Sequence, residues 1–175
     1  MCWCAYPDSS YGSGMTEQSP AVTVAHPPDA LLRAMNPVVK FLLRTPLAGG
    51  GLGRQMMVLN FTGRKSGRQF SVPVSAHQID NALYALASAG WTANFANGAN
   101  ADVLHNGKTT SMRGELIRDP AAVADLAYRS AQSYGAKTAQ RMMGLKFRDG
   151  TVPTLEEFTE AAQREKMSAV KLAPA

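Results

Sequence analysis

Residues 56–78 read MMVLNFTGRKSGRQFSVPVSAHQ, in which two apolar runs flank a basic turn bracketed by glycines. The runs at 55–62 and 68–78 have the length and the turn-forming neighbours of β-strands. A connection this short predicts that the two strands pair as an antiparallel hairpin. Pro73 cannot donate a hydrogen bond to a neighbouring strand, so the second run is predicted to be an edge strand or to contain a bulge.

The sequence after this hairpin remains rich in strand patterns. Strands are predicted at 83–89, 101–106 and 109–117, with turns at Asp80-Asn81 and Gly107-Lys108 and a helical turn over 91–97. Residues 168–172 alternate between apolar and polar side chains and predict a sixth strand. About six antiparallel strands with few helices between them predict a small barrel.

Helices are predicted on both sides of this block. Asp119-Pro120 has the pattern of a helix start, and Thr154 with Glu157 forms a capping box. Apolar residues recur at helical spacing between Asp29 and Arg44, before a glycine-rich loop. The expected helices are 29–44, 120 to about 135, 137–144 and 155–166. The predicted fold class is therefore α+β, mainly β, with peripheral helices.

The composition fits one domain. The 175 residues are 45% hydrophobic, which is enough for one core. Residues 1–28 are rich in Ser, Gly, Pro and Tyr and lack periodicity, so they are predicted to be a disordered tail before a domain at 29–175. Cys2 and Cys4 both lie in that tail and build neither a disulfide framework nor a zinc site. A reducing, cytoplasmic setting is expected, with no secretion signal and no membrane-spanning segment.

The charge balance favours an anionic partner. Lys and Arg outnumber Asp and Glu by 18 to 13, and the net charge is +5. Nucleic-acid binding usually needs cations gathered along one face, but here they are dispersed except at 64–68, so nucleic acid is the least favoured partner. His77 and His105 are isolated and predict ordinary strand residues with satisfied rings rather than a metal site.

The basic turn raises a specific question about anion binding. Gly63 and Gly67 allow positive φ and close backbone approach, so several N–H groups can converge on one anion. Ser66 adds a hydroxyl, and cations stand at 64, 65 and 68. The pattern favours a phosphate or carboxylate site but lacks the spacing of a P-loop. A solvated turn with incidental cations is the alternative.

Three stretches resemble the deazaflavin-dependent nitroreductase family. They are FTGRKSG at 61–67, RQFSVPVSAHQIDNALYALAS at 68–88 and GWTANFANGANADVLHNGKTTSMRGELI at 90–117. The resemblance covers about 31–172, and TGRKSG is its most specific part. It implies a split β-barrel, as in the pyridoxamine-phosphate-oxidase-like proteins that bind flavins. It also implies coenzyme F420 as the cofactor, with FMN as a less favoured alternative.

The resemblance also implies roles for individual residues. The cofactor's phosphate and glutamate tail would be held by the turn, which consists of Gly63, Arg64, Lys65, Ser66, Gly67 and Arg68. Pro73 and Val74 would line the deazaflavin. The segment that meets the polar edge of the ring would contain Ala89, Gly90, Trp91, Asn94 and Phe95, although packing is the ordinary role of a tryptophan such as Trp91. Arg54 and Lys108 are weaker candidates for anion contacts.

The implied reaction is hydride transfer from reduced F420 to a quinone, a nitroaromatic compound or a similar electron-poor small molecule. No catalytic residue is assigned, because this scheme requires no acid or base. Family members that reduce quinones use aromatic side chains, often tyrosine, near the acceptor. Tyr128 and Tyr134 lie in the region after the barrel, but the resemblance does not assign them to those positions. The alternative is a non-catalytic module that binds a flavin, deazaflavin, haem or fatty acid in the same cleft. A monomer or a homodimer, and peripheral membrane contact, all remain compatible with the sequence.

Overall fold

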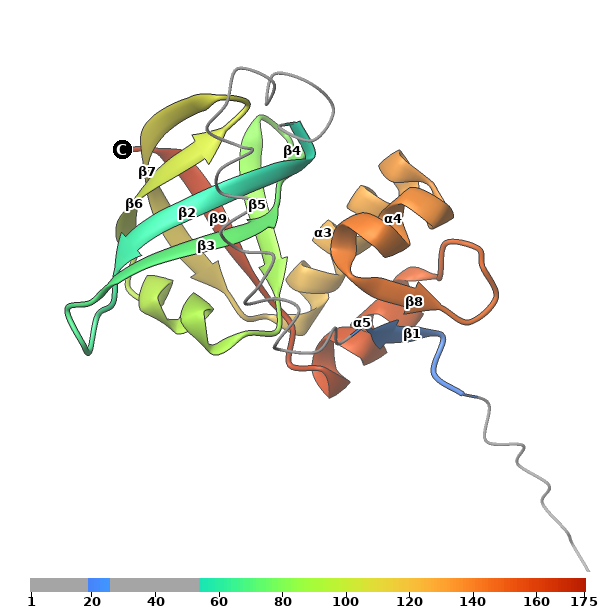
Figure 1. Cartoon of the computed structure of the whole chain (residues 1–175). Coiled ribbons are helices and arrows are strands. Elements are labelled where there is room, and N and C mark those ends of the chain that lie inside the picture. The colour runs from blue at the N-terminus through green and yellow to red at the C-terminus, as the bar shows by residue number, and fades with distance from the viewer. Residues whose placement is uncertain (1–18, 26–53) are drawn as a thin grey trace, which may run out of the picture.

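The computed structural model of the chain describes residues 19–25 and 54–175. Most strands in these ranges belong to one antiparallel, seven-stranded sheet in the order β3-β2-β6-β7-β9-β5-β4. Figure 1 shows that this sheet curls around its own interior. We call it the curled sheet. Its strands are β2 (Met56–Thr62), β3 (Gln69–Ser75), β4 (His77–Ile79), β5 (Ala82–Ala87), β6 (Ala99–His105), β7 (Lys108–Ile117) and β9 (Ser168–Pro174).

A second part of the molecule, which we call the helical unit, packs beside the curled sheet (Figure 1). It combines three helices with a two-stranded antiparallel sheet. Its elements are β1 (Val22–Val24), α3 (Pro120–Tyr134), α4 (Ala136–Met143), β8 (Leu145–Phe147) and α5 (Leu155–Arg164). A short 3₁₀ helix, η2 (Gly90–Phe95), joins β5 to β6.

Each part has its own apolar core. The interior of the curled sheet is filled by residues such as Met57, Leu59 and Phe61, which alternate along β2 as expected for one face of a strand. Val58, from the opposite face, belongs to a separate small cluster with Leu104. The core of the helical unit contains Phe158, Phe147 and many alanines.

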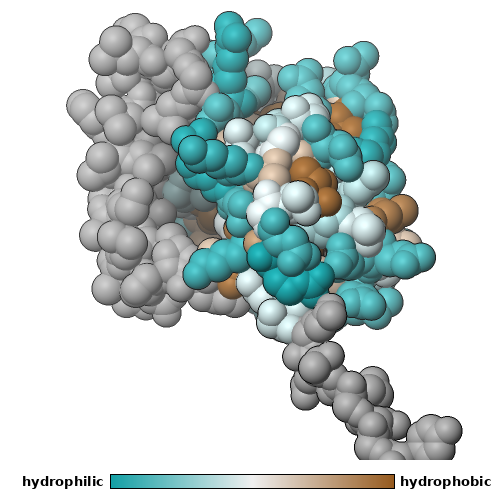
Figure 2. Space-filling view, turned by 90° about the vertical axis from the view of Figure 1, so that its right-hand side faces the viewer, coloured by the Kyte–Doolittle hydropathy of each residue, from teal (hydrophilic) through white to brown (hydrophobic). Residues whose placement is uncertain are grey.

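The surface of the helical unit has the polarity expected from this inward packing. Figure 2 turns the unit toward the viewer, and the coloured part of that face is mainly hydrophilic, with small, separate hydrophobic patches.

Neighbouring residues in the sequence fix where α3 and α5 begin. Asp119 accepts a hydrogen bond from the N–H of Ala122 at 2.9 Å, and Thr154 and Glu157 form a reciprocal capping box. Among the described residues, no helix is long and apolar enough to cross a membrane.

The α+β class, with an antiparallel sheet of the split-barrel type and peripheral helices, is confirmed. The hairpin of β2 and β3 also forms as expected. β3 is an edge strand, and Pro73 lies opposite Val58 in the register with β2. The edge position removes the need for a second hydrogen-bonding neighbour, which explains how the strand accepts proline.

Other expectations need correction. The tail prediction for residues 1–28 is wrong at Val22–Val24, which form β1, pair with β8 and bury Val22 completely. The run 68–78 is two strands, because the ladder with β2 ends at Ser75 and β4 pairs with β5 instead. β8 was not predicted, since three residues give too little pattern. The expected helix 29–44 and the loop after it lie outside the described residues.

Candidate functional site

The basic turn, residues 63–68, is closed by its own backbone. The N–H of Gly63 donates to the carbonyl of Arg68 at 2.7 Å, and the N–H of Gly67 donates to the carbonyl of Gly63 at 2.8 Å. Gly67 has a φ of 64°, which favours glycine. A Cβ on Gly63 would lie 2.5 Å from Cε2 of Phe70. Both glycines are therefore required by the geometry of the turn.

Asn94 connects the basic turn to η2. Its Oδ1 accepts a hydrogen bond from the backbone N–H of Arg64 at 2.9 Å. Its Nδ2 donates to the carbonyl of Trp91, within the same helix, at 2.8 Å. The turn is thus held against η2 by one side chain that is itself oriented by the helix.

These hydrogen bonds correct the expected mode of anion binding. The N–H groups of Gly63, Arg64 and Gly67 already have protein acceptors, and that of Arg68 is 3.4 Å from Oγ of Ser66. Within the turn, the N–H groups of Lys65 and Ser66 alone have no acceptor among the described residues. The side chains of Arg64, Lys65 and Arg68 are exposed and form no ion pair with the described residues. Anion binding at the turn would therefore depend on cationic side chains, together with the N–H groups of Lys65 and Ser66.

An aromatic cluster supports the base of the turn. The ring of Phe61 stacks on Phe70 with centroids 5.5 Å apart and meets Phe95 edge-on at 5.0 Å. Trp91 lies 6.1 Å from each of Phe61 and Phe95. Phe70 is 37% exposed, whereas Phe95 is completely buried. Aromatic surface is thus available beside the cations at Phe70 and on the half-buried Trp91.

The expected cofactor residues do not all face one site. Val74 packs toward the interior of the curled sheet together with Trp91, whereas Pro73 lies on the opposite face, across from Val58. Their side chains therefore cannot both line one ring. Phe95 is buried against Gly114, so its role is packing.

The two weaker anion candidates lie away from the turn. Arg54 precedes β2, and Lys108 pairs with His105, which in turn lies opposite Met57 near the start of β2. The basic turn instead follows the end of β2. Arg54 and Lys108 are therefore at the other end of β2 from the basic turn. Arg54 lines a cavity of about 250 Å³, and Lys108 lines a separate cavity of about 300 Å³.

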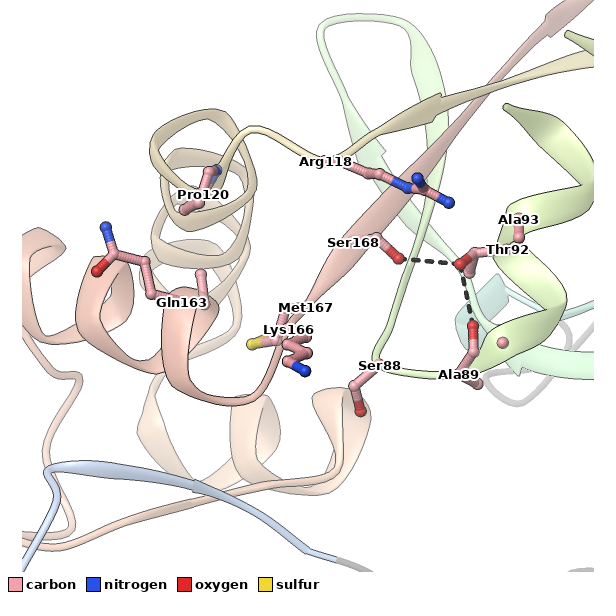
Figure 3. A pocket seen from close by; sticks show the side chains of 12 residues that line it. Ser88, Ala89, Thr92, Ala93, Arg118, Pro120, Gln163, Lys166, Met167 and Ser168 are labelled. Carbon is pink, nitrogen blue, oxygen red and sulfur yellow. Dashed lines mark hydrogen bonds between the residues drawn. The ribbon is translucent and has the colours of Figure 1, made fainter. Parts of the chain in front are cut away.

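A cavity of about 410 Å³, which we call the junction cavity, lies between the curled sheet and the helical unit (Figure 3). Ala89, Gly90, Thr92 and Ala93 form one side of it, so it contacts residues of η2 other than Trp91 and Asn94. Residues near the start of α3, the end of α5 and the start of β9 complete it. The lining also includes Ser88, Arg118, Pro120, Ala162, Gln163, Lys166, Met167 and Ser168.

Hydroxyl groups fix the η2 side of the junction cavity. Oγ1 of Thr92 donates to the carbonyl of Ala89 at 3.0 Å, and Oγ of Ser168 lies 3.1 Å from Oγ1 of Thr92 (Figure 3). Oγ of Ser168 is also 3.1 Å from the carbonyl of Ala87. The cations Arg118 and Lys166 were not predicted as site residues, because single cations at element boundaries carry no motif.

A buried polar pair lies where β4 meets α3. Nδ1 of His77 is 3.2 Å from the hydroxyl of Tyr134, but Nε2 has no hydrogen-bond partner among the described residues. Burial lowers the pKa of His77 to about 4 and raises the pKa of Tyr134. The expectation of satisfied rings is therefore wrong for one nitrogen of His77, whereas Nε2 of His105 is 3.1 Å from the carbonyl of Arg54.

The two tyrosines that follow the curled sheet lie away from the junction cavity. Tyr128 packs on Phe158 in the helical unit, and neither Tyr128 nor Tyr134 lines the cavity.

Comparisons with known proteins give only distant structural likeness. No family model and no curated protein matches the sequence. One similar solved structure is described as a domain-swapped dimer, with 15% identity, a TM-score of 0.42, and coverage of 84% of this chain and 100% of that one. Another is the conserved hypothetical protein Rv2991 from Mycobacterium tuberculosis, with 12% identity, a TM-score of 0.40, and coverage of 91% and 86%. Similarities of this size do not assign the chain to a family.

Proposed function

We propose that the protein is an oxidoreductase that uses reduced deazaflavin coenzyme F420 to reduce an electron-poor small molecule such as a quinone or a nitroaromatic compound. The observation that carries the proposal is the basic turn, which Asn94 holds beside η2 and the aromatic cluster. This places three exposed cations next to aromatic surface. The arrangement suits a ligand that has an anionic tail and a flat ring.

The residues fit such a cofactor in two respects. Arg64, Lys65 and Arg68 would hold its phosphate and carboxylate groups, since their side chains form no ion pair with the described residues. The exposed ring of Phe70 and the half-buried ring of Trp91 would offer flat apolar surface to its ring. The cofactor, when bound, supplies the hydride. The protein binds the tail, orients the ring and limits the access of water.

The chemistry of these two regions also suits the non-catalytic alternative. The basic turn and the lining of the junction cavity contain no His, Tyr, Cys, Asp or Glu. Among the usual proton donors of enzymes, these two regions therefore offer lysine alone, at Lys65 and Lys166. Hydride transfer does not require a proton donor, but neither does a module that only binds a flavin or a deazaflavin. Turnover separates the two functions.

The proposed function is tested first by binding. The full chain is titrated with F420 and, separately, with FMN, at low and high salt, while tryptophan fluorescence is followed. We expect F420 to bind at micromolar concentration or tighter, more weakly at high salt, and FMN to bind less tightly. Replacing Arg64 and Lys65 together by Ala should weaken F420 binding several-fold. Unchanged affinity in that variant, or binding of neither compound, would contradict the proposal.

A matched control and a turnover assay complete the test. Lys137 and Lys146 are exposed and lie in the helical unit, so replacing both by Gln removes the same charge without touching the turn. This control should bind F420 as the unmodified protein does. Oxidation of reduced F420 by a quinone in the presence of the protein supports the enzyme, whereas tight binding without turnover supports the binding module.

A further inference from the structure

Two cations line the junction cavity without a carboxylate. Arg118 lies between β7 and α3, and Lys166 follows α5. None of the other residues in the lining is acidic. The neighbouring acids are engaged elsewhere, since Asp119 caps α3 and Glu165 pairs with Arg164 at 3.1 Å. Two positive charges thus share one cavity with no described anion to balance them.

The two side chains reach toward different parts of the cavity. In Figure 3 the guanidinium of Arg118 points toward Thr92, and the ammonium of Lys166 points toward the side where Ser88 lies. The hydroxyls of Thr92 and Ser168 are already hydrogen-bonded to each other and to backbone carbonyls. A charged group that enters the cavity would therefore be met mainly by the two cations.

The backbone at Lys166 gives the fold no reason to prefer lysine. Lys166 has a φ of 49° and follows the C-cap of α5, where the N–H of Met167 donates to the carbonyl of Ala162 at 2.9 Å. Glycine or asparagine is the usual residue at such a position. A cation is already supplied to this helix end by Arg164. Lysine thus stands at a place where the backbone favours a smaller residue.

We infer that the junction cavity is a binding site for a small organic anion, namely a carboxylate on an aromatic or similarly compact body. Arg118 binds the carboxylate with its planar guanidinium, and Lys166 adds positive charge at the other side of the cavity. Ala89, Gly90, Ala93 and Met167 supply apolar walls for the body of the ligand. The inference goes beyond the proposed function, because it requires no cofactor at the basic turn.

The test compares two probes that differ in charge. The full chain is titrated by calorimetry with 4-nitrobenzoate and with 4-nitrobenzamide, without any cofactor. The two compounds have nearly the same size and ring, but only the first is an anion. We expect the unmodified protein to bind 4-nitrobenzoate about tenfold more tightly, with a preference that decreases at high salt. Equal affinities, or no binding of 4-nitrobenzoate at millimolar concentration, overturn the inference.

Variants of Arg118 and Lys166 test whether the preference for 4-nitrobenzoate arises in the junction cavity. Replacing Arg118→Gln together with Lys166→Gly should abolish it, and glycine suits the positive φ at residue 166, so the fold is expected to persist. Arg118→Gln alone changes one exposed side chain and should remove part of the preference. The control Lys137→Gln with Lys146→Gln should keep all of it. A preference that survives the cavity variant overturns the inference.

The result is independent of the F420 titration. If the preference is lost when Arg64 and Lys65 are replaced by Ala, the anion binds at the basic turn and the inference fails. If 4-nitrobenzoate binds through Arg118 and Lys166 but F420 does not bind, only the proposed cofactor function fails. Thermal unfolding of each variant identifies any loss that arises from instability.

Discussion

The basic turn and the junction cavity are two cationic regions that meet the same short helix in different ways. The turn presents Arg64, Lys65 and Arg68 on an open surface and reaches η2 through Asn94. The cavity presents Arg118 and Lys166 within walls that include Thr92 and Ala93 of η2. Cations on an open surface act at longer range and are screened by salt, whereas cations in a cavity select for size and shape as well as charge.

This difference suggests a division of labour around η2. An open row of cations tolerates a long and variable anionic chain, while the cavity accepts only a compact group. Because both regions depend on the position of η2, a disturbance of that helix should affect both. A change confined to one side should affect one region alone. The following four predictions use this distinction, from the largest expected change in stability to the smallest.

Replacing Gly114 by Ala should have the largest effect. The new Cβ would lie 2.4 Å from Cδ1 of Phe95 and 3.2 Å from Cγ1 of Val170, in a fully buried part of the curled sheet. Phe95 ends η2, so the helix must shift, and we expect a loss of roughly 2–3 kcal/mol in the free energy of unfolding. Chemical denaturation measures it. Gly90→Ala is the control, since nothing lies within 4 Å of a Cβ there. Similar stabilities for the two variants would show that η2 is not held by this contact.

Replacing Trp91 by Ala should disturb the turn side alone. The half-buried ring contacts Phe61 and Phe95, and its loss is expected to cost roughly 1–2 kcal/mol. F420 affinity should fall, while the preference for 4-nitrobenzoate should persist, because Trp91 does not line the junction cavity. Trp91→Phe, which keeps an aromatic ring, should lose less stability and less F420 affinity than Trp91→Ala. A loss of the anion preference in Trp91→Ala would mean that the two sides of η2 are coupled.

Replacing Asn94 by Ala should release the basic turn from η2. The N–H of Arg64 would lose its acceptor at a partly exposed site, and we expect a cost of about 1 kcal/mol. Hydrogen exchange at the Arg64 amide should accelerate, which NMR can follow. Asn97→Ala is a suitable control, because Asn97 is exposed and makes no hydrogen bond with the described residues. Unchanged exchange at Arg64 would disprove the bridging role of Asn94.

Replacing Arg64 and Lys65 by Ala should change stability least. Both side chains are exposed and form no ion pair with the described residues, so the free energy of unfolding should stay within about 0.5 kcal/mol of the unmodified value. The several-fold loss of F420 affinity would then be a binding effect. A large drop in the melting temperature would instead show that these side chains support the turn.

Local patterns predicted most of the fold. The hairpin of β2 and β3, the edge position of Pro73 and the caps at Asp119 and Thr154 each depend on neighbours in the sequence. β1 could not be found in this way, because Val22 is buried only against a core built by α3, α5 and β8. Its ladder with β8 joins two segments that are far apart in the sequence. Arg148, just after β8, likewise donates a hydrogen bond to the carbonyl of Ser19, 129 positions earlier.

The site was predicted in part for the same reason. The glycines and cations of the turn are contiguous, so their joint role could be anticipated from FTGRKSG. The hydrogen bond from Arg64 to Asn94, and the presence of Arg118 and Lys166 in the lining of one cavity, require the tertiary fold. Conversely, Pro73 and Val74 are adjacent in sequence but face opposite sides of the sheet, which the alternation of a strand would have indicated.

The position of β9 has a consequence for the order in which the sheet assembles. β9 follows every other strand of the curled sheet in the sequence, yet it lies between β7 and β5 within the sheet, with Val170 and Leu172 almost completely buried. Until it is added, β3-β2-β6-β7 and β5-β4 have no ladder joining them. The curled sheet therefore cannot be completed before its final strand has paired on both edges. The junction cavity, which Ser168 of β9 helps to line, depends on the same late step.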